Sequence, residues 1–277
     1  MSIHKLLAQD RTLIMGVLNV TPDSFSDGGK FLSPLPAIEH VYKMVEEGAD
    51  IIDIGGESSR PGSDPVSIEE EVNRVLPIIE ALIDNISVPL SIDTYKSKVA
   101  QKALKVGVEI VNDISGLRSD PEMGKIISEY KAFVIIMHMK GTPKNMQDNP
   151  YYDNLLEEII EFFNRQIQFA VNSGIQKNRI ILDPGIGFGK RIADNFVLLN
   201  SLQKLADLGY PMLVGPSRKS FIGLTLKLPP NQRVEGTAAA VTASILNGAK
   251  IVRVHDVKEM KRVVTITDLI IRNGQQS

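Results

Sequence analysis

One pattern repeats eight times between Ile14 and His255: a short apolar run stops abruptly on polar residues. A segment long enough for a helix separates almost every pair of runs. Eight such strand–helix units predict a (β/α)8 TIM barrel, in which the functional residues lie at the carboxyl ends of the strands. The runs end at Asn19, Ser58, Thr94, Ser115, His138, Asp183, Lys219 and Asp256.

Several runs are nearly continuous in Val, Ile and Met, which is typical of strands buried on both faces in a parallel sheet. The segments between the runs carry apolar residues at three-to-four spacing, which predicts amphipathic helices. We expect these helices over 35–48, 67–85, 95–107, 120–130, 151–174, 195–209, 234–248 and 257–273. Ser67 followed by Glu70 predicts a capped helix start. The alternative fold is a doubly wound open sheet, because a count of units does not prove closure.

Composition excludes several classes of protein. The 277 residues include no cysteine, which rules out disulfides, thiolate metal sites and thiol nucleophiles. A net charge of −2 without a Lys/Arg block argues against sequence-independent nucleic-acid binding. The amino terminus lacks the pattern of a secretion signal, and no apolar run approaches the roughly 20 residues that span a bilayer. We expect one barrel domain over 1–277, located in the cytoplasm, with neither nucleic-acid nor membrane partners.

Two carboxylates stand inside apolar runs, Asp93 in LSIDT and Asp183 in IILDPG. A buried carboxylate costs free energy unless it is paired or hydrogen-bonded. Either one alone is equally compatible with a structural acid held by backbone N–H groups or a lysine. Together with Asn112 and Lys219 they suit a flat heterocycle with an amino–oxo edge. The aspartates would accept its N–H groups, Asn112 could accept and donate, and Lys219 would donate to a ring carbonyl.

The triplet Arg253–Val254–His255 places two cationic or donor side chains on the same face of a strand. A nearby oxygen ligand such as Asn19 would suit a Mg²⁺ that also holds a phosphorylated substrate. The alternative is an Arg–His pair that caps the last helix or bridges to an acid. No two of the four histidines have zincin spacing, which argues against a histidine-only metal centre.

Four loops after strands complete the functional rim. PSRKS (216–220) introduces a helix whose free N–H groups suit a phosphate or carboxylate, with Ser217 or Ser220 as the expected N-cap. PGIGFGK (184–190) matches neither a dinucleotide fingerprint nor a P-loop, and we interpret it as a loop that brings Phe188 close to a ligand. Loops 21–29 and 58–65 are rich in Gly, Pro, Ser and Asp, a composition typical of mobile functional loops.

These segments together resemble the dihydropteroate synthase family in its bacterial, single-domain form. The resemblance covers essentially the whole chain in order. Its motifs are MGVLNVTPDSFSDGG (15–29), GGESSRPG (55–62), SIDTYK (91–96), NDISG (112–116), DPGIGFGK (183–190), GPSRKSFIG (215–223), EGTAA (235–239) and RVHDV (253–257). One departure is Ser59, where the family usually has Thr. Serine keeps the hydroxyl and loses a methyl group.

The resemblance implies a (β/α)8 transferase that acts in folate biosynthesis. Such an enzyme joins 6-hydroxymethyl-7,8-dihydropterin diphosphate to 4-aminobenzoate and releases diphosphate and 7,8-dihydropteroate. It further implies an SN1-like course, Mg²⁺ as cofactor, pterin diphosphate binding first, and a homodimer formed through helices near the carboxyl end. Val263, Ile266, Leu269 and Ile270 offer such a face, although the same stripe is equally compatible with packing on the barrel.

The resemblance also assigns residues to each substrate. The pterin would be held by Asp93, Asn112, Asp183 and Lys219, with Ile114, Met137 and Phe188 around its ring. The diphosphate would contact Ser59, Arg253 and His255, and Asn19 would contact Mg²⁺. The aminobenzoate would lie among Phe25, Arg60, Pro61, Lys219 and Ser220, and Asp27 would lock the first loop onto the second. The groups expected to act in catalysis are Asp27, Asp93, Asp183, Lys219, Arg253 and His255.

Two other functions remain open from the sequence. A pterin-binding methyltransferase domain on a similar barrel would keep the acids and amides but would not need a diphosphate clamp such as Arg253 and His255. A non-catalytic relative would bind pterin or serve as a partner subunit, although the intact loops argue against it.

Overall fold

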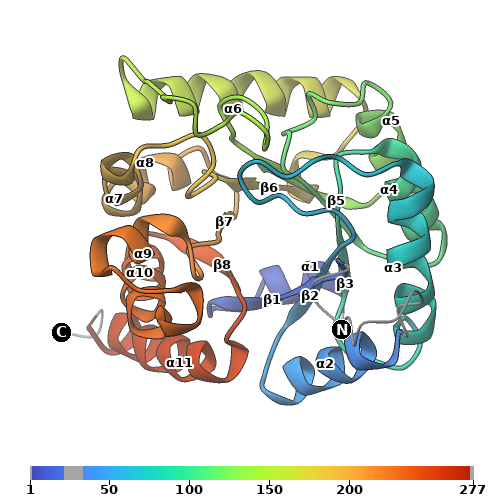
Figure 1. The fold of residues 1–277 in the computed structure, drawn as a ribbon, viewed down its shortest axis with the longest axis horizontal. Coiled ribbons are helices and arrows are strands. Elements are labelled where there is room, and N and C mark those ends of the chain that lie inside the picture. Colours follow the sequence, from blue (N-terminus) through green and yellow to red (C-terminus); the bar gives the residue numbers. More distant parts are fainter. Residues whose placement is uncertain (1, 22–33, 275–277) are drawn as a thin grey trace.

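The computed structural model describes residues 2–21 and 34–274, and its eight parallel strands close into a barrel surrounded by helices (Figure 1). Strands pair in chain order, and the circle closes where Leu13 and Met15 of the first strand pair with Ile251 and Arg253 of the last. The predicted (β/α)8 barrel is therefore confirmed, and the open-sheet alternative is wrong. The strands are β1 (Leu13–Asn19), β2 (Ile51–Gly55), β3 (Leu90–Asp93), β4 (Ile110–Asp113), β5 (Phe133–Met137), β6 (Ile180–Asp183), β7 (Met212–Val214) and β8 (Ala249–Val254).

Helices cover the outside of the barrel and match the predicted segments with small shifts at their ends. They are α1 (Ile3–Leu7), α2 (Leu35–Glu46), α3 (Ile68–Leu82), α4 (Ser97–Lys105), α5 (Met123–Glu129), α6 (Leu155–Asn172), α7 (Ile192–Asn200), α8 (Leu202–Ala206), α9 (Ser220–Leu226), α10 (Val234–Leu246) and α11 (Val257–Gly274). Two short 3-10 helices lie in connecting segments: η1 (Lys177–Arg179) precedes β6, and η2 (Pro230–Gln232) precedes α10. The predicted cap of α3 is present, since the Glu70 N–H donates to Ser67 Oγ at 3.1 Å.

Three local predictions differ from the structure. The run ending at Lys219 forms a strand only as far as Val214, because Gly215 and Pro216 follow and proline has no N–H to donate to a neighbouring strand. The single helix expected over 195–209 is two helices, which meet where Ser201 leaves helical geometry (φ −109°, ψ 14°). The short helix α1 was not expected from the sequence.

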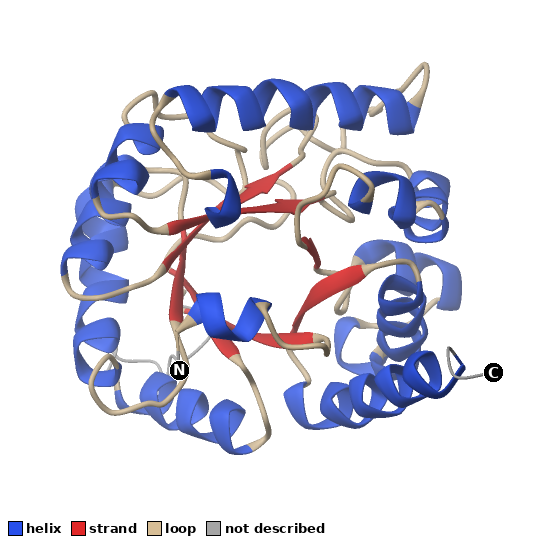
Figure 2. Cartoon of the chain, turned by 180° about the vertical axis from the view of Figure 1, so that it is seen from behind, coloured by secondary structure: helices blue, strands red, loops and turns tan. Residues whose placement is uncertain are grey.

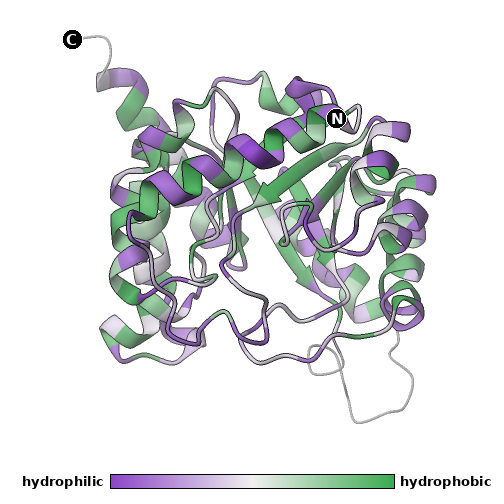
Figure 3. Ribbon diagram, turned by 90° about the horizontal axis from the view of Figure 1, so that it is seen from above, coloured by the Kyte–Doolittle hydropathy of each residue, from purple (hydrophilic) through white to green (hydrophobic). Residues whose placement is uncertain are grey.

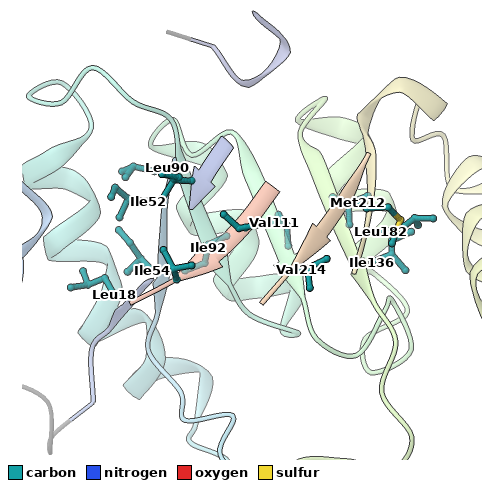
Figure 4. Packing of buried hydrophobic residues seen from close by; sticks show 14 of the residues in the cluster. Leu18, Ile52, Ile54, Leu90, Ile92, Val111, Ile136, Leu182, Met212 and Val214 are labelled. Carbon is teal, nitrogen blue, oxygen red and sulfur yellow. The ribbon is translucent and has the colours of Figure 1, made fainter. Parts of the chain in front are cut away.

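Side-chain alternation sorts the strand residues into two cores. Outward-facing residues such as Ile52, Ile92 and Val214 pack against the helices in one large apolar cluster (Figure 4). Inward-facing residues such as Met15 and Ile135 fill the amino-terminal half of the barrel, together with Ile3 and Leu6 of α1. Helix α1 lies across the barrel end seen in Figure 2, next to the N-terminus.

Hydropathy follows the same layering. The strands in the middle of the molecule are mostly hydrophobic, while the surrounding helices alternate hydrophobic and hydrophilic faces (Figure 3). Over residues 2–21 and 34–274, no helix combines the length and the apolar character needed to cross a membrane.

Candidate functional site

The inward-facing positions change from apolar to polar toward the carboxyl ends of the strands. In β2 the inward residue Ile51 is followed two residues later by Asp53, and in β4 Ile110 is followed by Asn112. In β3 both inward residues, Ser91 and Asp93, are polar. The strand registers pair Asp93 with Asn112 on β4. Because strand side chains alternate, the next inward-facing position on each strand is two residues further along. These positions bring the polar groups together in the half of the barrel near the carboxyl ends of the strands, which we call the upper half.

Arg253 of β8 lies between two buried acids. Its Nε donates to Asp53 Oδ2 at 2.7 Å, and its Nη2 donates to Asp93 Oδ2 at 2.8 Å. The Asn112 amide donates to the same Asp53 oxygen at 2.8 Å. Asp53 is fully buried and its carboxylate is held from two sides, so it orients both Arg253 and Asn112. Removing the cation would leave two buried acids without compensation.

Two oxygens of this cluster, Asp53 Oδ1 and Asn112 Oδ1, are buried without a hydrogen-bond partner among the described residues. Of these two residues Asn112, which is 3% exposed, lines the cavity at the barrel mouth. Buried acceptors are nearly always satisfied, so an unsatisfied one next to a cavity indicates a ligand donor. One N–H of the amide donates to Asp53, and Asn112 Oδ1 is left to accept from that ligand.

The two acids predicted from the sequence have raised pKa values. Burial raises the pKa of Asp183 to about 6, although the Gly185 N–H donates to Asp183 Oδ1 at 2.7 Å and favours the charged form. Burial also raises the pKa of Asp93 to about 7, against the opposing effect of Arg253. Each carboxyl group is therefore within reach of protonation near neutral pH.

Lys219 reaches into the same cavity from the loop after β7. Its Nζ lies 3.9 Å from the centroid of the Phe188 ring, in a cation–π contact. Burial, together with the charge of the nearby Arg253, lowers the pKa of Lys219 to about 8. Because Lys219 and Arg253 extend into the cavity, its free volume is about 20 Å³, which is enough for about one water molecule. A ring-sized ligand would therefore require these side chains to move.

His255 follows β8 and contacts Ser217. The His255 backbone N–H donates to Ser217 Oγ at 3.2 Å, and the hydroxyl lies 3.1 Å from Nδ1. Burial beside Arg253 lowers the pKa of His255 to about 3, which keeps the imidazole neutral. The donor interpretation of His255 is thus favoured over the cationic one, and Nε2 is the ring nitrogen left to donate.

The prediction that Ser217 or Ser220 caps the helix is wrong. The N-cap of α9 is Lys219, without a side-chain capping bond, and Ser220 is the first helical residue. Ser217 Oγ accepts the His255 backbone N–H, and an ion pair between Arg218 and Asp256 stabilises the loop.

The Gly-rich loop after β6 needs its glycines for close approach. Gly185 and Gly189 have φ of +69° and +60°, and a Cβ at either position would meet the backbone oxygen of His138 or Lys140 within 2.3 Å. These contacts press the loop against the end of β5 and place Phe188 beside the cavity, as predicted. Lys190 is buried behind the loop, with its Nζ 3.1 Å from His138 Nδ1, so His138 faces away from the cavity.

Most of the predicted site residues converge. Nine of them line the cavity: Ser59, Asp93, Asn112, Ile114, Met137, Asp183, Phe188, Lys219 and Arg253. Arg60, Pro61 and Ser220 are exposed outside this lining. Phe25 and Asp27 lie outside the described residues. The sequence reasoning missed Asp53, Gly185, Ile186 and Gly215. Asp53 carried the same signal as Asp93 and Asp183, an acid inside an apolar run.

The described side chains suit a metal ion that binds together with a phosphorylated ligand. They do not suit one that is coordinated by protein groups alone. In the two described segments, no three His, Asp or Glu residues cluster as metal ligands. Asn19 ends β1, which lies between β2 and β8, and its half-buried amide offers a hard oxygen. Mg²⁺ commonly takes one or two protein oxygens, with substrate phosphates and water supplying the rest. The donor set therefore fits the predicted Mg²⁺.

Comparison with known proteins gives a consistent result. A family model described as pterin binding enzyme matches residues 15–255. The chain is 48% identical over 264 residues to the dihydropteroate synthase of Clostridium beijerinckii, covering 95% of this chain and 96% of that relative. A crystal structure of dihydropteroate synthase from Clostridium difficile in the presence of pteroic acid aligns with a TM-score of 0.89 at 50% identity, over 94% of this chain and 97% of that chain. The Xanthomonas albilineans dihydropteroate synthase with 4-aminobenzoic acid aligns with a TM-score of 0.88 at 43% identity, over 94% and 93%.

Proposed function

The chain belongs to the dihydropteroate synthase family of pterin-binding enzymes, and we propose that the upper barrel interior is where it performs the family reaction. The family are transferases that join 6-hydroxymethyl-7,8-dihydropterin diphosphate to 4-aminobenzoate, giving 7,8-dihydropteroate and diphosphate. The observation that supports the assignment best is the unsatisfied Asn112 Oδ1 between two acids at the cavity. An amino–oxo heterocycle supplies the N–H groups that these acceptors require.

In the proposed complex the pterin ring is bound edge-on by polar groups and face-on by apolar ones. Asp93, Asp183 and Asn112 accept N–H groups of the ring, and Lys219 donates to its carbonyl. The ring faces lie against Ile114, Met137 and Phe188. Lys219 must leave the Phe188 ring for this arrangement, since its ammonium lies over that face in the structure.

The diphosphate is assigned to Ser59, Arg253 and His255. Arg253 uses Nε and Nη2 for Asp53 and Asp93, which leaves Nη1 outside both ion pairs and able to donate to a phosphate oxygen. Neutral His255 is assigned the tautomer in which the Ser217 hydroxyl donates to Nδ1, and this tautomer contributes an Nε2–H donor. Mg²⁺ held at Asn19 would neutralise part of the diphosphate charge and assist its departure.

The proposed chemistry is an SN1-like substitution at the pterin methylene carbon. The carbon–oxygen bond to diphosphate breaks first, with the electron pair leaving on oxygen, where Arg253 and His255 stabilise it. Positive charge spreads into the pterin, where ionised Asp93 and Asp183 stabilise it. The aniline nitrogen of aminobenzoate then attacks the carbon and loses a proton. Asp93, Asp183, Lys219, Arg253 and His255 are thus the proposed catalytic groups.

The aminobenzoate is assigned to the rim above the pterin. Lys219 belongs to both sites, and Ser220, Arg60 and Pro61 are exposed at the rim where the second substrate would arrive. The C. difficile and X. albilineans relatives were crystallised with pteroic acid and 4-aminobenzoic acid, which supports this pair of subsites. The proposed order is pterin diphosphate first. The assigned roles of Phe25 in the aminobenzoate site and of Asp27 in locking the first loop onto the second stay predictions.

A homodimer is proposed through the outer helices near the carboxyl end. On α11 the residues Met260 and Val264 are buried, whereas Ile266, Leu269 and Ile270 are 59%, 47% and 60% exposed. The stripe therefore points outward rather than onto the barrel, apart from the partly buried Val263. A contiguous exposed apolar face of this kind is typical of subunit contacts. We also propose that the protein acts in the cytoplasm.

The decisive experiment mixes the protein with both substrates and Mg²⁺ and measures diphosphate release. Release that requires aminobenzoate and yields dihydropteroate supports the proposal. A folded protein that binds pterin but releases no diphosphate above background would be a non-catalytic relative. Methyl transfer from a methylated folate to a corrinoid, with no diphosphate release, would identify the methyltransferase alternative.

A further inference from the structure

A second, larger cavity opens beside the pterin pocket. It encloses about 460 Å³ between the loops that follow β2, β3, β4 and β5. Of the described residues that line the two cavities, Ile114 is the one they share. A volume of this size lies in the range of small-molecule sites, which is roughly 300–1,000 Å³. The proposed reaction leaves this cavity without a role.

The walls of the cavity are apolar and rigid. Ile114 and Met139 belong to one buried cluster, with Tyr95 packed against it. The Tyr95 hydroxyl donates to Glu57 Oε1 at 2.5 Å, which fixes the ring, and burial raises the pKa of Tyr95 so that it stays a neutral donor. An aromatic ring placed between these side chains would bury apolar surface on both faces.

The loops on either side of the cavity are joined to each other. The Gly62 N–H donates to the Pro143 carbonyl at 3.0 Å, which links the loop after β2 to the loop after β5. Pro65 and Pro143 line the cavity from these two loops. Because the link is between backbones, the wall does not depend on a mobile side chain.

Charge at the mouth favours an anion. The Arg118 guanidinium lies over the Phe162 ring at 5.2 Å and donates from Nε to Ser115 O and from Nη2 to Met139 O, both at 2.7 Å. These bonds orient the guanidinium and leave Nη1 outside them. Lys144 adds a second positive charge, in an exposed and therefore weak pair with Asp64.

The acid on the opposite wall, Glu57, is held by hydrogen bonds. It accepts from Lys96 Nζ at 2.6 Å, from the Val66 N–H at 2.8 Å and from the Tyr95 hydroxyl, while Lys96 also pairs with Glu71 at 2.6 Å. The cavity thus combines apolar walls with a preoriented cation at its mouth.

We propose that this cavity is a second small-molecule site, which binds a flat aromatic ring carrying one carboxylate. The ring lies between Ile114, Met139 and Tyr95, and the carboxylate is bound by Arg118. The site is distinct from both substrate positions of the proposed reaction and does not require turnover to be detected.

Methionine-methyl NMR with 2-naphthoate as the probe tests the site directly. Met139 lines the second cavity and Met137 lines the pterin pocket, so the two methyl resonances report separate sites. The expected result is a saturable shift of Met139 that persists with 7,8-dihydropteroate present, because that ligand spans both proposed substrate positions. No Met139 shift, or loss of the shift when dihydropteroate is added, would overturn the proposal.

Variants and a matched ligand test the recognition of the anion. Arg118→Gln is expected to weaken 2-naphthoate binding about tenfold, as is replacing the ligand by uncharged 2-naphthamide. Ser119→Phe, at the mouth, is expected to abolish the Met139 shift while Met137 still responds to dihydropteroate, which shows that the protein is folded. Lys125→Gln on the exposed face of α5 is the control and should leave the affinity unchanged. Equal binding by wild type and Arg118→Gln would rule out the assigned carboxylate contact.

Discussion

The two halves of the barrel interior are built by the same strands, but one half is an apolar core and the other is a polar site. The amino-terminal half is filled by residues such as Met15, Ile135 and Ile251, and α1 packs over them. The carboxyl-terminal half holds Asp53 and Arg253 in one buried polar network. On β8, Ile251 and Arg253 are successive inward-facing residues, so the apolar core and the polar site meet at neighbouring positions of one strand.

The difference teaches how a stable barrel tolerates buried charge. Apolar packing in the lower half, with the large helix–strand core outside it, supplies the favourable free energy of folding. The upper half contains acids whose pKa values are raised by burial, which means that their charged forms are destabilised there. Mutations in the lower half should therefore lower stability and spare function, whereas mutations in the upper half should impair function.

The largest effect is expected from Arg253→Ala, which removes the cation between Asp53 and Asp93. Leaving buried acids unpaired typically costs about 3–5 kcal/mol of unfolding free energy, and activity should fall below detection. Urea unfolding at pH 8 measures the change, because at that pH Asp93 is ionised. Arg253→Met keeps much of the packing and should be as inactive. A loss of stability under about 1 kcal/mol would contradict the ion-pair account.

Ile135→Ala makes the opposite test in the lower half. Ile135 is fully buried, and such a truncation costs about 2–5 kcal/mol of unfolding free energy because a cavity remains. The rate constants of the folded fraction, measured well below the melting temperature, should stay near those of wild type. A selective loss of pterin affinity would show that the two halves are not independent.

Asp183→Asn probes a single carboxylate of the upper half. An amide N–H facing a ring donor should weaken dihydropteroate binding by about 10–100-fold, since a hydrogen bond to a charged group contributes roughly 1.5–3 kcal/mol. Calorimetry measures the affinity. The pKa of Asp183 is raised in the folded protein, so the unfolding free energy of wild type falls as pH rises from about 4 to 6. Asparagine has no such titration, and the variant should therefore be no less stable than wild type above pH 6. Unchanged affinity would refute the assigned role.

The pH dependence of pterin binding should be bell-shaped. Asp183 and Asp93 must be ionised to accept, and their pKa values are raised to about 6 and about 7, so affinity should rise with pH on the acid side. Lys219 must be protonated to donate, and its pKa is lowered to about 8, so affinity should fall above that pH. The alkaline limb should change by up to about tenfold per pH unit, and the acid limb, where two carboxyl groups must ionise, by up to about a hundredfold. A profile flat from pH 5 to 9 would contradict both assignments.

The smallest effect is expected from Arg60→Ala, on the exposed loop after β2. It should raise the KM for aminobenzoate about fivefold, equivalent to roughly 1 kcal/mol, and leave pterin affinity near wild type. Steady-state kinetics and calorimetry separate the two. If both substrates weakened equally, the proposed binding order would be wrong.

The acids show which parts of the site were readable from the sequence. Asp93 and Asp183 were found because an acid inside an apolar run must be compensated. Asp53 carried the same signal, yet it was missed, because only the register shows that Arg253 and Asn112 meet it. Asp113 also ends a strand, but it faces the helices and accepts the N–H groups of Ser115 and Leu117 in a turn. Strand-end position alone therefore does not separate binding acids from turn acids.

The sequence by itself determined the eight strand–helix units, most helix positions and, with the family resemblance, nine of the residues around one cavity, because hydrophobic periodicity and strand-end chemistry are local properties. Only the tertiary structure decided that the sheet closes, that Asn112 Oδ1 is left to accept, that His255 is neutral, and that α11 exposes its apolar stripe. It also decided that a second cavity lies behind Ile114. These properties depend on which side chains meet across different strands and loops, and burial and pairing at such contacts are set by three-dimensional packing.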